Sequence, residues 1–202
     1  MKSRALAIAT LLPALLLAVA CHDEPVQPTD ASANTSVSQP PGAQTQGAES
    51  GPAVAIFRVS LAPLNNSGVH GTATLAVRGS DLVVQLQAVG HIPDLQHVQH
   101  IHGFSDGTDA TCPPPSAAGD DGVLTFAEGL PFYGPVQLNL TPFPTPTNSA
   151  GSIQYHASFA SADLAFSPSD LELKTMVLHG AFVGGTYVPS LPVACGVVER
   201  VN

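Results

Sequence analysis

Residues 97–112 read HVQHIHGFSDGTDATC, which places three histidines within six positions and ends on one of the chain's three cysteines. If residues 98–103 form a strand, its side chains alternate between two faces, so His100 and His102 share one face and Ile101 lies on the other. Ile101 is then a core residue, and the two imidazoles stand side by side outside the core. Two neighbouring histidines on one strand are half of a copper or zinc site. The alternative is that exposed histidines flank a core strand by chance.

Short apolar runs surround this stretch and recur along the chain between Gly, Pro, Asn and Asp residues. They are residues 53–61, 71–77, 82–89, 98–102, 136–140, 153–159, 171–179 and 193–201. Several alternate in polarity; in residues 82–89, for example, Leu82, Val84 and Leu86 alternate with Gln85 and Gln87. Beyond the N-terminal segment, no window of useful length carries a helical period. The pattern predicts an all-β domain, a Greek-key β-sandwich or barrel of about eight strands.

The N-terminus has the features of an export signal. Residues 1–20 combine Lys2 and Arg4 with an apolar run and a small residue, Ala20, before a cleavage point. Residues 17–21, LAVAC, resemble a bacterial lipobox, although Ala18 stands where that pattern prefers leucine. We therefore expect Cys21 to be lipidated and to anchor the mature protein to a membrane. The alternative is an ordinary signal peptide that is cut near a cysteine.

Residues 21–52 are predicted to be a disordered linker behind the lipidated cysteine. They consist largely of Pro, Thr, Ser, Gln, Ala and Gly, and they show no apolar period. Such a segment buries too little surface to offset its ordering entropy. Residues 53–202, about 150 in number, are enough for one domain with its own core. The expected location is the bacterial cell envelope, on its periplasmic or surface side.

Charge restricts the partners. The formal net charge is −9, and without Lys2 and Arg4 the basic residues are Arg58, Arg78, Lys174 and Arg200. An acidic surface repels phosphate backbones, so nucleic acid is excluded as a partner. The chain has no P-loop, no dinucleotide fingerprint and no Gly-x-Ser-x-Gly elbow, and no activated nucleophile indicates a hydrolase. The sequence names no protein or small-molecule partner.

The cysteines that remain after lipidation of Cys21 are Cys112 and Cys195. In the oxidising compartment that an exported chain enters, the expected state of such a pair is a disulfide. The bridge would close a loop of about 80 residues, worth roughly 4–5 kcal/mol in the chain-entropy account. The alternative, two thiolate metal ligands, has no support from a known Cys-x-x-Cys spacing.

Three patches of the sequence resemble the copper/zinc superoxide dismutase family. That family combines a His-x-x-His-x-His run, a Gly-Asp and a cysteine, then a lone histidine after an apolar strand and a final Ala-Cys-Gly-Val. This chain has histidines 97, 100 and 102, Asp106-Gly107, Cys112, MVLH at residues 176–179 and ACGVV at residues 194–198. The resemblance implies a Greek-key fold with copper ligands His100, His102 and His179. It implies a structural His97 that holds a loop to a strand through hydrogen bonds.

The departures from that family affect the metal and the activity. The bridging histidine is expected near Ala118, but residues 113–119 read PPPSAAG. No histidine occurs between His102 and His156, so the zinc ligands are missing and the sequence argues against zinc. Asp120 or Asp121 is at most a remnant of a zinc carboxylate.

The position of the family's substrate-guiding arginine holds Pro192, and the chain has no Lys or Arg between Arg78 and Lys174. Superoxide is an anion that a positive rim attracts. The resemblance therefore implies a copper site with weak or no dismutase activity.

A second resemblance is to the chordin-type (CHRD) domain, which has a His-Ile-His-Gly motif like residues 100–103 after a segment like residues 68–77. It implies the same sandwich fold but a different role. The protein would be a non-enzymatic binding module of the cell envelope, with metal-free histidines.

Two further features have competing interpretations. Residues 119–128, GDDGVLTFAE, end like a calcium-binding EF loop, but Ala117 and Gly119 stand where that loop needs side-chain oxygens. We interpret the segment as an Asp-Asp-Gly turn, which argues against calcium. His156, on the polar face of the strand at residues 153–159, either replaces a missing ligand or is simply exposed.

Overall fold

The computed structural model describes residues 55–201. The predicted signal peptide, the lipidated Cys21 and the linker at residues 21–52 lie outside this range. Within it, none of the helices has both the length and the apolar character that crossing a bilayer requires.

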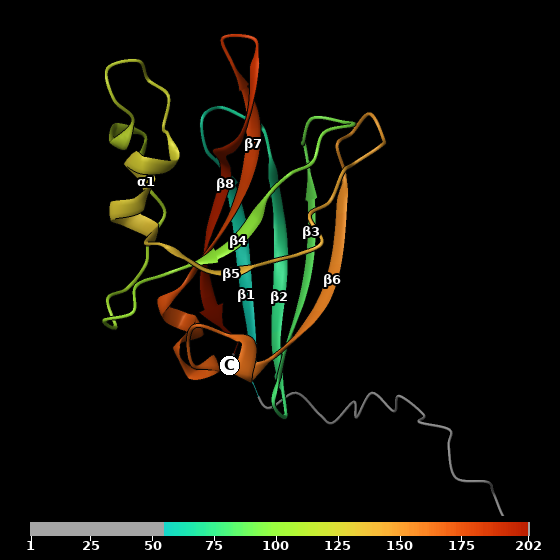
Figure 1. The fold of residues 1–202 in the computed structure, drawn as a ribbon, viewed down its shortest axis with the longest axis vertical. Helices are drawn as coiled ribbons and strands as arrows, with labels where there is room; N and C mark the ends of the chain where they lie inside the picture. The colour runs from blue at the N-terminus through green and yellow to red at the C-terminus, as the bar shows by residue number, and fades with distance from the viewer. Residues whose placement is uncertain (1–54, 202) are drawn as a thin grey trace, which may run out of the picture. The chain divides into compact units, whose positions relative to one another are not determined.

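Eight antiparallel strands form one sheet in the order β5-β4-β7-β8-β1-β2-β3-β6 (Figure 1). The strands are β1 (Ala55–Pro63), β2 (His70–Arg78), β3 (Asp81–Val89), β4 (Gln99–His102), β5 (Val136–Asn139), β6 (Ile153–Ala160), β7 (Thr175–Val183) and β8 (Thr186–Arg200). The helical segments are α1 (Phe126–Tyr133) and the 3₁₀ helices η1 (Pro115–Ala117), η2 (Ser161–Asp163) and η3 (Pro168–Leu173). The predicted all-β domain of about eight strands is confirmed.

Three crossovers, β3 to β4, β5 to β6 and β6 to β7, give the sheet its Greek-key connectivity. β1, β2 and β3 are consecutive neighbours, but β3 does not pair with β4, and β6 does not pair with β7. After β3, after β5 and again after β6, the chain passes to the other half of the sheet. Figure 1 shows β4 and β5 passing in front of β1 and β2. Both halves contribute to a single core, which includes Leu86 of β3, Ile101 of β4 and Leu138 of β5.

Alternation of polar and apolar residues explains how the strands bury their surface. On β3, Leu82 and Val84 are fully buried while Gln85 and Gln87 are exposed, as the sequence pattern predicts. Each fully buried aliphatic side chain contributes about 1.5–3 kcal/mol through removal of apolar surface from water.

The last two strands, β7 and β8, differ most from the predicted limits. β7 begins at Thr175 rather than at residue 171, because η3 occupies residues 168–173 and Ser167 caps it by accepting a hydrogen bond from Ser169 N. β8 begins at Thr186 rather than at residue 193. The turn before it contains Gly184 and Gly185, both at positive φ, and it lets β7 and β8 pair directly as a hairpin.

The helix α1 is an element that the apolar period does not predict. It has eight residues and contains Gly129 and Pro131, so no amphipathic repeat develops. Its start is defined by a capping box, in which the Thr125 side chain accepts from Glu128 N and the Glu128 carboxylate accepts from Thr125 N.

A second, smaller apolar cluster lies outside the main core, between α1 and the strands β7 and β8. It consists of Tyr133, Val177 and Cys195, with Leu64, Cys112, Phe126 and Leu130 against it. Cys112 and Cys195 form a disulfide that joins the segment before α1 to β8. Thr111 N also donates to Phe132 O at 2.9 Å. These contacts fix α1 over the outer face of the sheet.

Candidate metal centre

The pairing of β4 with β7 brings three histidines together. His100 lies opposite Val177 and His102 lies opposite Thr175. His179 follows Val177 by two residues, so it shares the face of Val177 and is a diagonal neighbour of His100. Ile101 lies on the other face and is completely buried in the core.

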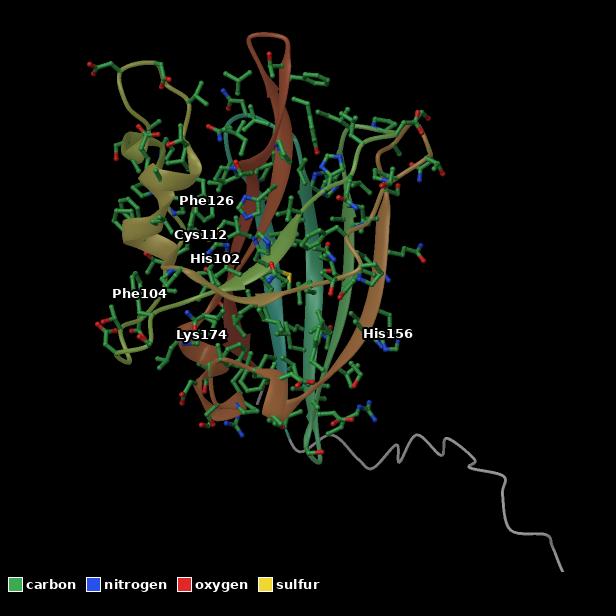
Figure 2. The ribbon with its side chains drawn as sticks, in the orientation of Figure 1. His102, Phe104, Cys112, Phe126, His156 and Lys174 are labelled. Atoms are coloured by element: carbon green, nitrogen blue, oxygen red, sulfur yellow. A yellow bond between two sulfur atoms is a disulfide. The ribbon has the colours of Figure 1, made fainter. Side chains whose placement is uncertain are left out.

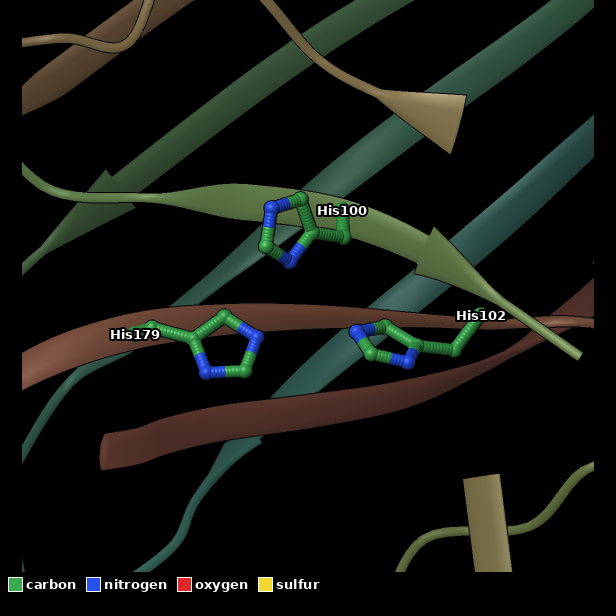
Figure 3. A group of neighbouring side chains, drawn as sticks. All are labelled: His100, His102 and His179. Carbon is green, nitrogen blue, oxygen red and sulfur yellow. The ribbon is translucent and has the colours of Figure 1, made fainter. Parts of the chain in front are cut away.

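The three rings converge on one small space. Potential ligand nitrogens of His100, His102 and His179 all lie within 4.8 Å of one another. The ring centroids are 5.4 Å apart for His100 and His102, 5.1 Å for His100 and His179, and 5.7 Å for His102 and His179. Figure 3 shows the rings turned toward the space between them. Nitrogens bound to one ion at about 2.0–2.1 Å are at most about 4.2 Å apart, so binding would draw the three rings closer together.

One nitrogen of each ring is already engaged by the protein. Nδ1 of His102 donates to Gly134 O at 2.9 Å, and Nδ1 of His179 donates to Ser190 O at 2.9 Å. The side chain of Asn139, the cross-strand neighbour of His100, hydrogen-bonds to the His100 ring. Such bonds to the outer nitrogen are typical of histidines that ligate metals, because they fix the tautomer and the ring orientation.

The remaining nitrogens are buried without a partner. They are Nδ1 of His100, Nε2 of His102 and Nε2 of His179. His100 as a whole is half-buried, but its Nδ1 is shielded from solvent. Each unsatisfied buried polar atom costs about 1–3 kcal/mol, so three in one cluster are a strong indication of a ligand.

Aromatic rings cover the cluster. Tyr133 lies against His102 with centroids 4.6 Å apart, and Phe126 is 6.0 Å from both His102 and His179. Phe143, on the segment between β5 and β6, is 5.8 Å from His100. The imidazoles are therefore outside the core, as the alternation predicts, but the interpretation of exposed histidines is wrong for this cluster because α1 covers it. Figure 2 labels His102, Phe126 and Cys112 on the α1 side of the sheet.

Burial keeps the three imidazoles neutral. It lowers the pKa of His100 and His102 to about 4 and that of His179 to about 3. Repulsion from His100 and His102 lowers the pKa of His179 further. Neutral imidazole is the form that binds a metal ion, so the cluster is ready to bind one near neutral pH.

His97 connects a loop to β7 next to the cluster. It is fully buried, and it donates from Nδ1 to His179 O at 3.0 Å or from Nε2 to Ile92 O at 2.8 Å, depending on its tautomer. A Cβ at Gly180, which has φ +108, would come within 2.8 Å of Nδ1. Only glycine therefore leaves room for His97 against the backbone of β7.

The remaining predicted positions do not join the cluster. His156 is exposed on β6 opposite Gln85, far from His102 in Figure 2, so it does not replace a missing ligand. Ala118 follows η1 and offers no ligand atom. Asp120 and Asp121 are exposed, and Asp121 Oδ1 accepts from Val123 N at 3.0 Å. Pro192 pairs with His179 across β7 and β8.

The segment that ends like an EF loop has its key carboxylate engaged elsewhere. Glu128 Oε1 accepts from Gly119 N at 3.0 Å, and Oε2 accepts from Thr125 N and Thr125 Oγ1, both at 2.8 Å. The carboxylate thus serves the turn and the helix cap.

Several residues of the site were missed by sequence reasoning. The Thr125–Glu128 spacing is a capping-box signature, and it could have located α1 and hence Phe126 and Tyr133. Asn139 and Phe143 carry no such signal, because their proximity to His100 depends on the β4–β5 pairing. Gly134 has φ +74, and a Cβ there would lie 2.6 Å from Gly103 O. A glycine is required at that position, and its carbonyl orients His102.

No protein-family profile matches the chain, and no curated protein matches it. Among solved structures, the Cu(II) structure of superoxide dismutase 5 from Candida albicans is similar to this chain, with 11% sequence identity and a TM-score of 0.42. That match covers 73% of this chain and 93% of the other.

Proposed function

We propose that this chain is an exported lipoprotein whose β domain binds one copper ion through His100, His102 and His179. The observation that carries the proposal is the convergence of three buried, unpartnered imidazole nitrogens whose opposite nitrogens are held by the protein. Cys21 would supply the membrane anchor, and residues 22–52 would separate the domain from the bilayer.

The ligand set favours copper over zinc and calcium. Imidazole suits both copper and zinc, but zinc takes a fourth ligand, either from the protein in a structural site or as a water in an open catalytic site. Among residues 55–201, no fourth His, Cys, Asp or Glu belongs to the group. Calcium needs oxygen ligands, which this group lacks. A bound copper ion would supply one-electron redox chemistry; the protein residues hold it and limit access to it.

Efficient dismutation is not expected from this site. Superoxide must reach the metal as an anion, and the position opposite His179 is a proline rather than a cation. Aromatic rings further cover the ligand nitrogens. We infer that the protein carries or sequesters copper in the cell envelope, with weak or no dismutase activity.

The test is the metal content of the full chain, exported from cells supplied with both copper and zinc and kept oxidised. We expect about one copper per chain by mass spectrometry of the metal. The His179→Ala variant should lose it. The matched control is His156→Ala, which removes an exposed histidine on β6 and should leave the copper content unchanged.

A metal-free wild-type protein that is fully folded would reject the proposal. The chordin-type alternative, a non-enzymatic binding module on a lipid anchor, would then be favoured. In that case the double variant His100→Ala and His102→Ala should leave partner binding unchanged.

A further inference from the structure

The space that a metal ion would occupy is enclosed by apolar rings. The Phe126 ring lies tilted against two of the three ligand rings, with its centroid 6.0 Å from those of His102 and His179, and Phe143 meets His100 edge-on at 5.8 Å. The three unpartnered nitrogens have practically no contact with solvent. A fourth ligand from water would have to displace one of these rings.

The position of Phe126 is fixed by the fold. It is the first residue of α1, directly after the capping residue Thr125. Tyr133 Oη donates to Phe126 O at 2.8 Å, which ties the two ends of the helix together. The Cys112–Cys195 disulfide belongs to the same apolar cluster as Phe126 and Tyr133. The Phe126 ring is therefore held in place next to the histidines by the fold itself.

The charge of the site limits the charge of its ion. All three ligands are neutral, no carboxylate belongs to the group within residues 55–201, and the walls are aromatic. The free energy of transferring an ion from water to an apolar environment grows with the square of its charge. For ions of similar size, it is therefore about four times as large for a dication as for a monocation. A monovalent ion fits these surroundings better, and aromatic faces also attract cations.

Coordination number points in the same direction. Cu(I) has a filled d shell and is satisfied by three nitrogen ligands. Cu(II) favours tetragonal sites, and zinc favours four ligands, so each would need a water molecule or an anion in the enclosed space.

We propose that the site is selective for Cu(I), held by three imidazoles, and that Phe126 and Phe143 determine this selectivity by excluding a fourth ligand. The inference rests on the proposed copper-binding function and adds to it the oxidation state and the residues that set it.

The first test uses the full-length wild-type chain. Under anaerobic conditions with ascorbate, Cu(I) should bind at one per chain in competition with bicinchoninate, and X-ray absorption at the copper edge should give three nitrogen ligands. Azide added to protein loaded with Cu(II) should leave the electron paramagnetic resonance spectrum unchanged, because no open position exists.

The second test removes the cover. Phe126→Ala should admit azide and strengthen Cu(II) binding relative to Cu(I). An added ligand to a charged ion is worth at least a hydrogen bond to a charged group, so the ratio of the two dissociation constants should shift by about ten- to a hundredfold. Phe126→Leu, which keeps apolar volume and preserves folding, should shift it less. Phe182→Ala removes an exposed ring on the β7–β8 hairpin and should have no effect.

Two outcomes would overturn the inference and are distinguishable. Cu(II) bound by the wild type with a water ligand, or with a spectrum that azide changes, would reject Cu(I) selectivity and leave copper binding intact. Absence of copper binding in both oxidation states would reject the proposed function, and the selectivity with it.

Discussion

At the scale of single residues, the candidate site depends on which nitrogen each histidine leaves free. His102 and His179 present Nε2 to the cluster because backbone carbonyls accept hydrogen bonds from their Nδ1–H groups. His100 presents Nδ1 instead, with Asn139 at its ring. The sequence predicts the face that His100 and His102 share, because alternation along a strand is local. It does not predict the tautomers, because Gly134 and Ser190 reach the rings only in the folded chain.

The histidine pKa values predict a pH dependence of stability. Burial lowers the pKa of His91, His100 and His102 to about 4, and that of His179 to about 3, from an ordinary value of 6.5. As pH falls below about 6.5, the unfolded chain takes up these protons before the folded chain does. The free energy of unfolding of the metal-free protein should therefore decrease from pH 6.5 toward pH 4 and be insensitive to these groups above pH 7.

Urea denaturation at pH 7.5, 6 and 5 checks this expectation. The His102→Gln variant should have a shallower pH slope than the wild type, since one buried titrating group is gone. His156→Ala, at an exposed position, should retain the wild-type slope. A wild-type stability that rises on acidification would contradict the prediction.

At the scale of elements, strands were predictable and short helical segments were not. Each strand carries its own alternation, so the limits of β2, β3 and β6 fall within a residue of the predicted ones. The apolar neighbours of Leu171 predict that it lies in a strand, but it is a buried residue of η3. α1 was missed because its stability comes from a cap and from packing rather than from a helical period.

The cap of α1 is the element's most direct test. Thr125→Ala removes the side-chain oxygen that accepts from Glu128 N, and it should lower the free energy of unfolding by about 0.5–2 kcal/mol. Denaturant titration measures the loss. Thr147→Ala, at an exposed position in the segment between β5 and β6, is the matched control and should change stability by less than about 0.5 kcal/mol. Equal effects of the two substitutions would argue against the cap.

At the scale of the whole molecule, the location that we predict for the protein depends on its N-terminus. Cys21 is the residue through which the sequence predicts membrane attachment, and a diacylated cysteine holds a protein at a bilayer far longer than one acyl chain does. Cys21→Ser should therefore move the protein from the membrane fraction to the soluble fraction of the envelope, with its copper content unchanged.

Cell fractionation followed by detection of the chain in each fraction measures this shift. The matched control Ser36→Ala changes a hydroxyl within the predicted linker and should stay in the membrane fraction. A Cys21→Ser protein that remains with the membrane would contradict lipid anchoring at this residue.

The pairing of the first strand with the last has a consequence for biogenesis. Phe57 on β1 lies opposite Arg200 on β8, so the sheet cannot close until nearly the whole domain has left the ribosome or the translocation channel. Likewise, His100 and His179 come together only after β7 has been synthesised and has paired with β4. Contacts this distant in sequence make folding slow, in the range of about milliseconds to seconds for β-barrels. Under the proposed function, the ion would therefore be acquired late, by a finished domain, in whichever compartment the chain completes its folding.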